Sequence, residues 1–185
     1  MLTLRPYEAR DAEIILSWVP DEFALRQWSA DRYGFFPVTA EDMNRQYAEA
    51  GDTVFPLTAA DGDKAAGHLI LRYTDRERQT VRLGFVIVDA ARRGRGLGRK
   101  MVELALTRAF EEMHARRVTL GVFENNPAAF SCYKAAGFRE VKLPVPISYP
   151  IMGESWACRE MAVTREQWRE HAMRSAGNGE SSCGS

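Results

Sequence analysis

Apolar side chains occupy every second position of residues 80–89, from Val81 through Leu83 and Phe85 to Ile87. This period of two predicts a strand, and it is the clearest one in the chain. Shorter patterns of the same kind predict six more strands, over residues 2–5, 53–59, 65–73, 117–123, 138–143 and 155–163. The turn Asp61-Gly62-Asp63 predicts that two of these strands form a hairpin.

Helical spacing of apolar residues separates several of these strands. Met101, Ala105, Ala109 and Met113 form one stripe and predict a helix over residues 97–113. Further helices are predicted over residues 11–19, 39–50 and 127–136, and after residue 164. The first residues of two of them, Thr39 with Asp42 and Thr164 with Gln167, resemble capping boxes. Residues 20–38, rich in aromatic side chains, and 144–153, rich in proline, are expected to be irregular.

The order of these elements predicts an α/β protein with one mixed sheet and helices packed on it. Hairpin strands fill the first half of the chain, and strands alternate with helices in the second half. No linker divides the sequence, so residues 1–174 are expected to form a single domain. Residues 175–185, rich in glycine and serine, are expected to form a flexible tail.

Composition removes several classes of protein from consideration. The 25 basic and 25 acidic side chains cancel, whereas nucleic-acid binders are usually basic. No apolar run reaches the roughly 18 residues of a membrane helix, and no signal peptide is recognised at the start. Three cysteines and three histidines without regular spacing argue against a disulfide framework and a zinc site. The expectation is therefore a cytoplasmic protein without a metal, with no nucleic-acid partner and no membrane partner.

A glycine-rich turn follows the clearest strand and precedes the helix over residues 97–113. Glycines let the backbone approach a ligand, and a helix N-terminus offers N–H groups and a positive dipole end, so this turn resembles a phosphate cradle. It is not a Walker loop, and Arg99 stands where the dinucleotide fingerprint needs a third glycine. A plain strand–helix turn is the alternative. The candidate phosphate-binding residues are Arg93, Gly94, Arg95, Gly96, Leu97, Gly98, Arg99 and Lys100.

This turn carries a resemblance to a known family. Arg93-x-x-Gly96-x-Gly98 matches the [Gln/Arg]-x-x-Gly-x-[Gly/Ala] motif of the GNAT N-acetyltransferase superfamily. A second stretch is similar to that family's other signature: a strand, an asparagine, an alanine, a tyrosine and then Gly-Phe. Its residues are Leu120 to Asn126, Ala129, Tyr133, Gly137 and Phe138. The two stretches together cover about residues 80–140, and the general look of the chain resembles the RimJ/RimL-like branch.

The resemblance implies the GNAT fold, a mostly antiparallel twisted sheet whose fourth and fifth strands splay apart, with helices on both faces. It also implies acetyl-CoA as co-substrate, with its pyrophosphate on the glycine-rich turn. Pantetheine-binding residues, one of which offers a backbone N–H to the acetyl oxygen, are implied at Phe85, Val86, Ile87 and Val88. Asn126 and Ala129 are implied as further cofactor-binding residues, and Tyr133 as the group that protonates the departing thiolate.

Three candidate residues, two of them named above, have alternative interpretations. Asn126 precedes Pro127, so it could act only as a helix N-cap. Tyr133 could be a core aromatic. The general base is open as well: Glu124, at the end of the strand over residues 117–123, is one candidate, and a relay through water is the other. A partly desolvated Glu124 carboxylate would have a raised pKa, and the alternative is that Glu124 is only an exposed charge at the end of the strand.

The leading hypothesis is acetyl transfer to a primary amine by direct attack, without an acyl-enzyme. The alternative is a non-catalytic acyl-CoA-binding sensor or scaffold. The acceptor is expected to be a small-molecule or peptide amine, bound by residues 20–38 and 144–153, and a homodimer is left open. Residues 1–60 carry twice as many acidic as basic side chains, which favours a cationic or neutral amine.

Overall fold

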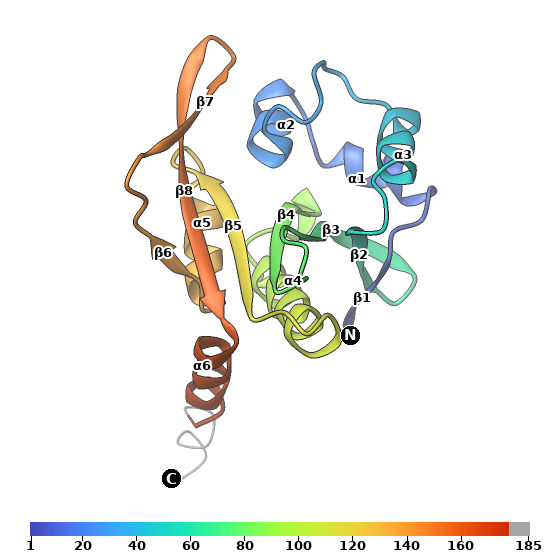
Figure 1. Ribbon diagram of the computed structural model, residues 1–185. Helices are drawn as coiled ribbons and strands as arrows, with labels where there is room; N and C mark the ends of the chain where they lie inside the picture. Colours follow the sequence, from blue (N-terminus) through green and yellow to red (C-terminus); the bar gives the residue numbers. More distant parts are fainter. Residues whose placement is uncertain (178–185) are drawn as a thin grey trace.

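The computed structural model describes residues 1–177 of the chain (Figure 1). The last helix, α6 (Arg165–Gly177), extends three residues into the segment expected to be a tail. The remainder of that expected tail, 178–185, lies outside the described residues.

Eight strands form one sheet through the middle of the molecule. Their order is β1-β2-β3-β4-β5-β8-β6, and β7 pairs with β8 beyond the end of β6. All pairs are antiparallel except β4 with β5. The strands are β1 (Leu2–Pro6), β2 (Val54–Asp61), β3 (Lys64–Tyr73), β4 (Thr80–Val88), β5 (Arg117–Phe123), β6 (Arg139–Val141), β7 (Ile147–Ile151) and β8 (Glu154–Thr164).

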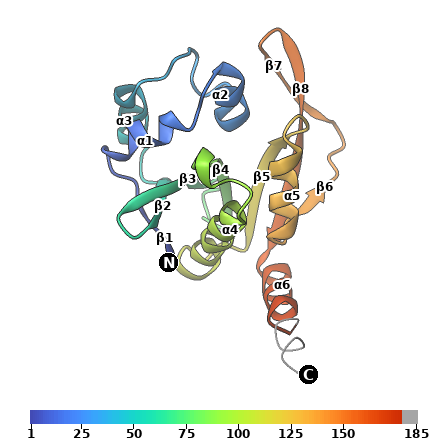
Figure 2. The ribbon, with the colours of Figure 1, turned by 180° about the vertical axis from the view of Figure 1, so that it is seen from behind.

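Helices cover both faces of this sheet, as predicted. On one face, α4 and α5 pack their apolar sides against alternate residues of the central strands, including Leu71, Leu83 and Leu120. On the other face, α1 and α3 bury Ile15 and Met43 beside Ile87. Figures 1 and 2 show the two layers from opposite sides. The helices are α1 (Asp11–Ser17), α2 (Glu22–Ser29), α3 (Ala40–Ala48), α4 (Leu97–Thr107) and α5 (Pro127–Ala135).

The parallel strands β4 and β5 stay together for only three residue pairs. Thr80 pairs with Arg117, and Arg82 with Thr119, after which the strands separate. Beyond this point β4 carries a bulge, because Ile70 of β3 pairs with Gly84 whereas His68 pairs with Ile87. A bulge adds residues to one strand and bends it away from its neighbour. The predicted splay of the fourth and fifth strands is thus present.

Two segments expected to be irregular are ordered elements. Helix α2 lies within 20–38, and its first turn is capped by Asp21, whose side chain accepts from the N–H of Ala24. Strand β7 lies within 144–153, where its five residues pair with β8 as an antiparallel hairpin. Pro150 sits in β7 at the edge of the sheet, where proline is tolerated because no partner strand needs its N–H.

The capping residues identified from the sequence do cap their helices. Thr39 Oγ1 accepts from the N–H of Asp42, and Asp42 Oδ2 accepts from the N–H of Thr39. Thr164 and Gln167 make the same reciprocal pair at the start of α6. The helix predicted over 97–113 is α4 followed by a π-helical turn, Arg108–Glu112.

Candidate active site

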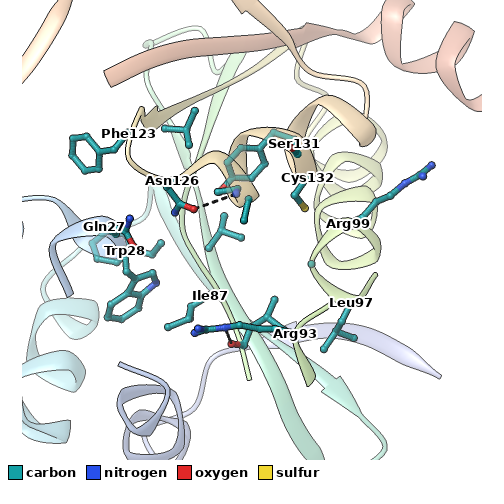
Figure 3. Close-up of a pocket in the computed structure, with 18 of the residues that line it drawn as sticks. Gln27, Trp28, Ile87, Arg93, Leu97, Arg99, Phe123, Asn126, Ser131 and Cys132 are labelled. Carbon is teal, nitrogen blue, oxygen red and sulfur yellow. Dashed lines mark hydrogen bonds between the residues drawn. The ribbon is translucent and has the colours of Figure 1, made fainter. Parts of the chain in front are cut away.

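A cavity of about 650 Å³ opens where β4 and β5 separate. Its wall combines β4, the glycine-rich turn, the end of β5, and helices α2 and α5 (Figure 3). Thirteen of the predicted site residues line it: Phe85, Val86, Ile87, Val88, Arg93, Gly94, Gly96, Leu97, Gly98, Arg99, Asn126, Ala129 and Tyr133. Arg95, Lys100 and Glu124 do not.

The turn before α4 has the geometry of an anion cradle. Gly94 and Gly96 have φ angles of +75° and +74°, which residues other than glycine rarely adopt. A Cβ built on either glycine would have no atom within 4 Å, so the space beside both is open. The first hydrogen bond of α4 runs from Lys100 N–H to Gly96 O, at 3.1 Å. The N–H groups before it, including those of Gly98 and Arg99, have no acceptor within the helix. These donors and this space fit a pyrophosphate.

The arginines of the turn have different tasks. Arg93 ties the turn to the fold, since its guanidinium donates to Val88 O (3.4 Å) and to Trp18 O (3.3 Å). Arg99 pairs with Glu103 one helical turn on, at 2.7 Å, and lies beside the cavity. Arg95 and Lys100 are exposed. Arg93 and Arg99 both line the cavity and, with the N-terminus of α4, make its mouth positive; Arg93 also holds the backbone in place.

The bulge in β4 shapes the middle of the cavity. Phe85 has a φ of +50° and turns the backbone there, and its ring packs edge-on against Trp28 of α2 at 5.4 Å between ring centroids. The strand stretch from Phe85 to Val88 lines the cavity directly. Because β5 has already separated, this part of β4 faces the cavity where a neighbouring strand would otherwise pair with it.

Tyr133 is held in the opposite wall by the local structure of α5. The helix ends in a Schellman motif: Phe138 N–H donates to Tyr133 O (3.0 Å) and Gly137 N–H to Lys134 O (3.1 Å). Gly137 has a φ of +103°, as this motif requires. The ring of Tyr133 is only 7% exposed and packs edge-on against Phe138. Burial raises the pKa of the Tyr133 phenol above its ordinary value of 10, so the hydroxyl stays protonated at neutral pH.

The start of α5 also belongs to the wall. Asn126 Oδ1 accepts from Ala129 N–H at 3.2 Å, so the capping interpretation is correct, and Asn126 lines the cavity as well. Cys132 lies beside Gly98 of α4, 3.5 Å from the position of an added Cβ. Burial raises the pKa of the Cys132 thiol, which makes it a poor nucleophile.

Helix α2 supplies the part of the wall that the sequence analysis did not resolve. Ala24, Gln27 and Trp28 line the cavity, and Trp18 joins them from the end of α1. Gln27 Nε2 donates to Asn125 O (3.0 Å) and Asn125 Oδ1 (3.2 Å), bridging α2 to the loop after β5. The sequence did contain a signal for this helix: Asp21 is a favourable N-cap, and Ala24, Gln27 and Trp28 follow it at helical spacing.

Glu124 does not have the environment expected of a base. Its side chain is 53% exposed and its Oε1 pairs with Arg159 Nε at 3.2 Å. It lines a separate hollow of about 110 Å³ with Phe130 and Arg159. Glu124 follows Phe123, the last residue of β5, and its exposed side chain lacks the desolvation expected beside Leu120 and Val122.

A different carboxylate lies beside the point where β4 and β5 separate. Glu160 of β8 is bidentate to Arg82 of β4, at 2.6 and 3.1 Å, and Arg82 also donates to Thr119 of β5. An added Cβ on Gly121, in the cavity wall, would stand 2.9 Å from Arg82 Nη2. The ion pair thus links β4, β5 and β8 at the point where β4 and β5 separate. The sequence did not predict it, because Arg82 and Glu160 are 78 positions apart.

A family model described as the acetyltransferase (GNAT) family matches residues 22–138. The chain belongs to this family. Its enzyme class is therefore N-acetyltransferase, and the GNAT resemblance of the two sequence stretches is confirmed. Among residues 1–177, no helix is long and apolar enough to cross a membrane, and no group of three or more metal-ligating side chains comes together.

Solved structures share the GNAT fold with the chain at low sequence identity. Spermidine N-acetyltransferase from Vibrio cholerae, in complex with CoA and spermine, superposes with a TM-score of 0.76 at 18% identity, over 91% of this chain and 98% of that one. The aminoglycoside acetyltransferase AAC(6')-Ib, in complex with coenzyme A and kanamycin, gives 0.73 at 18% identity, over 92% of this chain and 98% of that one.

Proposed function

We propose that the protein transfers the acetyl group of acetyl-CoA directly to a primary amine, without an acyl-enzyme. The observation that carries this proposal is the single cavity that joins the cradle at the N-terminus of α4 to the buried hydroxyl-bearing ring of Tyr133. The cradle would hold the pyrophosphate, and the free edge of β4 from Phe85 to Val88 would bind the pantetheine as an added strand. Structures of the two fold relatives named above contain CoA, which agrees with this assignment.

The residues present suit direct transfer. The amine attacks the acetyl carbonyl carbon, and the carbon–sulfur bond breaks. A backbone N–H in the bulge of β4 would stabilise the negative charge on the carbonyl oxygen. Tyr133, kept protonated by burial, would donate its proton to the departing sulfur.

The proton of the amine needs another route. Within the described chain, the lining of the cavity includes no aspartate, glutamate or histidine. We propose a relay through water in place of Glu124, which the structure puts elsewhere. An α-amine with a pKa near 8 costs about 1.4 kcal/mol to deprotonate at pH 7, against roughly 4.6 kcal/mol for a lysine, so amines of low pKa are the expected acceptors.

A screen of primary amines with acetyl-CoA, read as release of free thiol, tests this function. Acetylation of amines of low pKa ahead of alkylamines is the expected result. Tight binding of acetyl-CoA with no turnover across the panel would favour the non-catalytic binding module. Failure to bind acetyl-CoA would contradict the assignment of the cavity.

A further inference from the structure

Arg72 of β3 is a half-buried cation without a partner. It forms no ion pair and no side-chain hydrogen bond with any of residues 1–177. Its direct neighbour across the strand pair is Arg82, which Glu160 already neutralises. A half-buried charge without a counter-ion is costly unless a ligand supplies one.

The register places Arg72 directly opposite Arg82, whose guanidinium reaches the wall of the cavity, although Arg72 itself is not a lining residue. Arg72 pairs with Arg82, and Arg82 pairs with Thr119 in the last contact before β4 and β5 separate. Side chains directly opposite each other share a face of the sheet, so Arg72 and Arg82 lie on the face away from α4. The guanidinium of Arg82 in turn lies against Gly121 in the cavity wall.

The surroundings of Arg72 are positive. Burial lowers the pKa of its guanidinium, and the neighbouring charges of Arg32 and Arg82 lower that pKa further. Arg32 follows α2 and is exposed, whereas Arg72 lies within β3. Tyr149 of β7 is close enough to Arg72 and Arg82 to affect the pKa of each. Helix α2 and the β7–β8 hairpin contact each other through Phe23 and Trp156, whose ring centroids are 5.0 Å apart.

The acidic residues of the N-terminal third do not offset this charge. Asp11 accepts two short hydrogen bonds from Arg5, Glu22 pairs with Arg26, and Asp42 caps α3. The charged side chains in the cavity lining are both arginines, Arg93 and Arg99. Six of the ten acidic residues of 1–60, which favoured a cationic acceptor, thus have partners within the fold, and none of the ten lines the cavity.

From this arrangement we propose that the acceptor is a primary amine that also carries an anionic group, a carboxylate or a phosphate, which Arg72 binds with help from Arg32. The proposal rests on the acetyl transfer proposed above and names its substrate class. It separates this protein from the two fold relatives, whose structures contain the polycationic amines spermine and kanamycin. Amino-acid-like molecules and chain termini with a nearby carboxylate belong to the class, as do aminoalkyl phosphates.

Matched acceptors test the anionic group apart from the amine. Glycine oligomers of two to five residues have an α-amine of low pKa and vary the distance to the carboxylate by about 3.5 Å per residue. Each is compared with its C-terminal amide, and 2-aminoethyl phosphate with 2-aminoethanol. We expect kcat/KM for at least one acid to exceed that of its neutral partner by about tenfold or more. Preference for the phosphate pair alone would identify a phosphate as the anion, and equal values in every pair would overturn the proposal.

Variants assign the preference to residues. Arg72→Gln should reduce the ratio of acid to amide to within about threefold by slowing the acid only, and Arg72→Lys should restore part of it. Arg32→Gln, at an exposed position, should reduce the ratio by a smaller factor and covers the case in which Arg72→Gln does not fold. Arg169→Gln on α6, at an exposed arginine outside the cavity lining, is the matched control and should keep the parental ratio (Figure 1). An unchanged ratio in the Arg72 and Arg32 variants would overturn the proposal.

A binding measurement separates this proposal from the proposed function. If acids and amides are acetylated equally, acetyl transfer stands and the anion site is wrong. If no amine turns over, calorimetric titration of the CoA-loaded protein with the same pairs decides the anion site alone. About tenfold tighter binding of an acid, lost in Arg72→Gln, would support the site, and equal affinities would overturn it.

Discussion

At the scale of single residues, the proposed acetyl transfer depends most directly on the hydroxyl of Tyr133. Its ring is fixed by the C-terminal turn of α5 and by Phe138, so removal of the oxygen alone leaves the packing in place. The thiolate that departs has a parent pKa near 8.5, close to ambient pH, so protonation assists its departure without being essential. General acids of this kind contribute about 10²- to 10⁴-fold.

We expect Tyr133→Phe to lower kcat by at least about tenfold and to leave the dissociation constant of acetyl-CoA within about threefold. Steady-state kinetics with any acceptor, beside a cofactor titration, measures the two quantities. Tyr73→Phe is the matched control, because its hydroxyl donates to Met113 O outside the cavity lining. Equal kcat in Tyr133→Phe and the parent would reduce Tyr133 to a core aromatic.

At the scale of elements, the N-terminus of α4 depends on a backbone that other residues adopt with difficulty. Gly96 is the N-cap of α4, with a left-handed φ and open space where a Cβ would stand. A side chain there would both strain the turn and occupy the space assigned to the pyrophosphate. The cradle is therefore sensitive to a single added methyl group.

We expect Gly96→Val to weaken acetyl-CoA binding by tenfold or more, equivalent to about 1.4 kcal/mol, as measured by calorimetric titration. Gly51→Val separates strain from obstruction, because Gly51 has the same φ of +74° and the same open space, outside the cavity lining. This control should lose a similar amount of stability and keep its affinity. If Gly96→Val folds and binds as the parent does, the cradle is not the pyrophosphate site.

At the scale of the whole molecule, His68 connects strand β3 to helices α2 and α3. It is fully buried in β3, and its Nε2 lies 2.7 Å from the hydroxyl of Tyr47 in α3. Trp28 of α2 packs edge-on against the same imidazole. Burial lowers the pKa of His68 from 6.5 to about 3, so the ring stays neutral in the folded protein.

This imidazole should make the fold sensitive to mild acid. Below pH 6.5 the unfolded chain binds a proton at His68 and the folded protein does not, so the free energy of unfolding falls by up to about 1.4 kcal/mol per pH unit. Between pH 7 and pH 5 we expect urea denaturation to show a loss of about 2 kcal/mol that His68→Gln removes. His114→Asn, at an exposed residue with a φ of +56°, should retain the loss. An equal pH dependence in parent and His68→Gln would contradict the neutral, buried state of the ring.

Much of the fold and half of the site were readable from local sequence. Strand β5, the start of α5 after Asn126, the capping boxes and the glycine-rich turn depend on residues within a few positions of one another. Such short-range patterns are fixed by backbone geometry and capping hydrogen bonds, which act the same way in any fold. This is why the predicted cradle, β4 and Tyr133 do line one cavity.

Other features were decided only by the tertiary structure, because they join residues far apart in the chain. Pairing with β8 makes a strand of the proline-rich segment, and a capped helix completes the cavity wall where an irregular segment was expected. The exposure of Glu124 beside Arg159 is likewise decided only on folding. The same holds for the ion pair between Glu160 and Arg82, which are 78 positions apart in the chain. The charge of residues 1–60 was known from the sequence, but which charges neutralise each other was not. The register of β3, β4 and β5 makes that choice: Arg82 pairs with Glu160, and Arg72 opposite it has no counter-ion among residues 1–177.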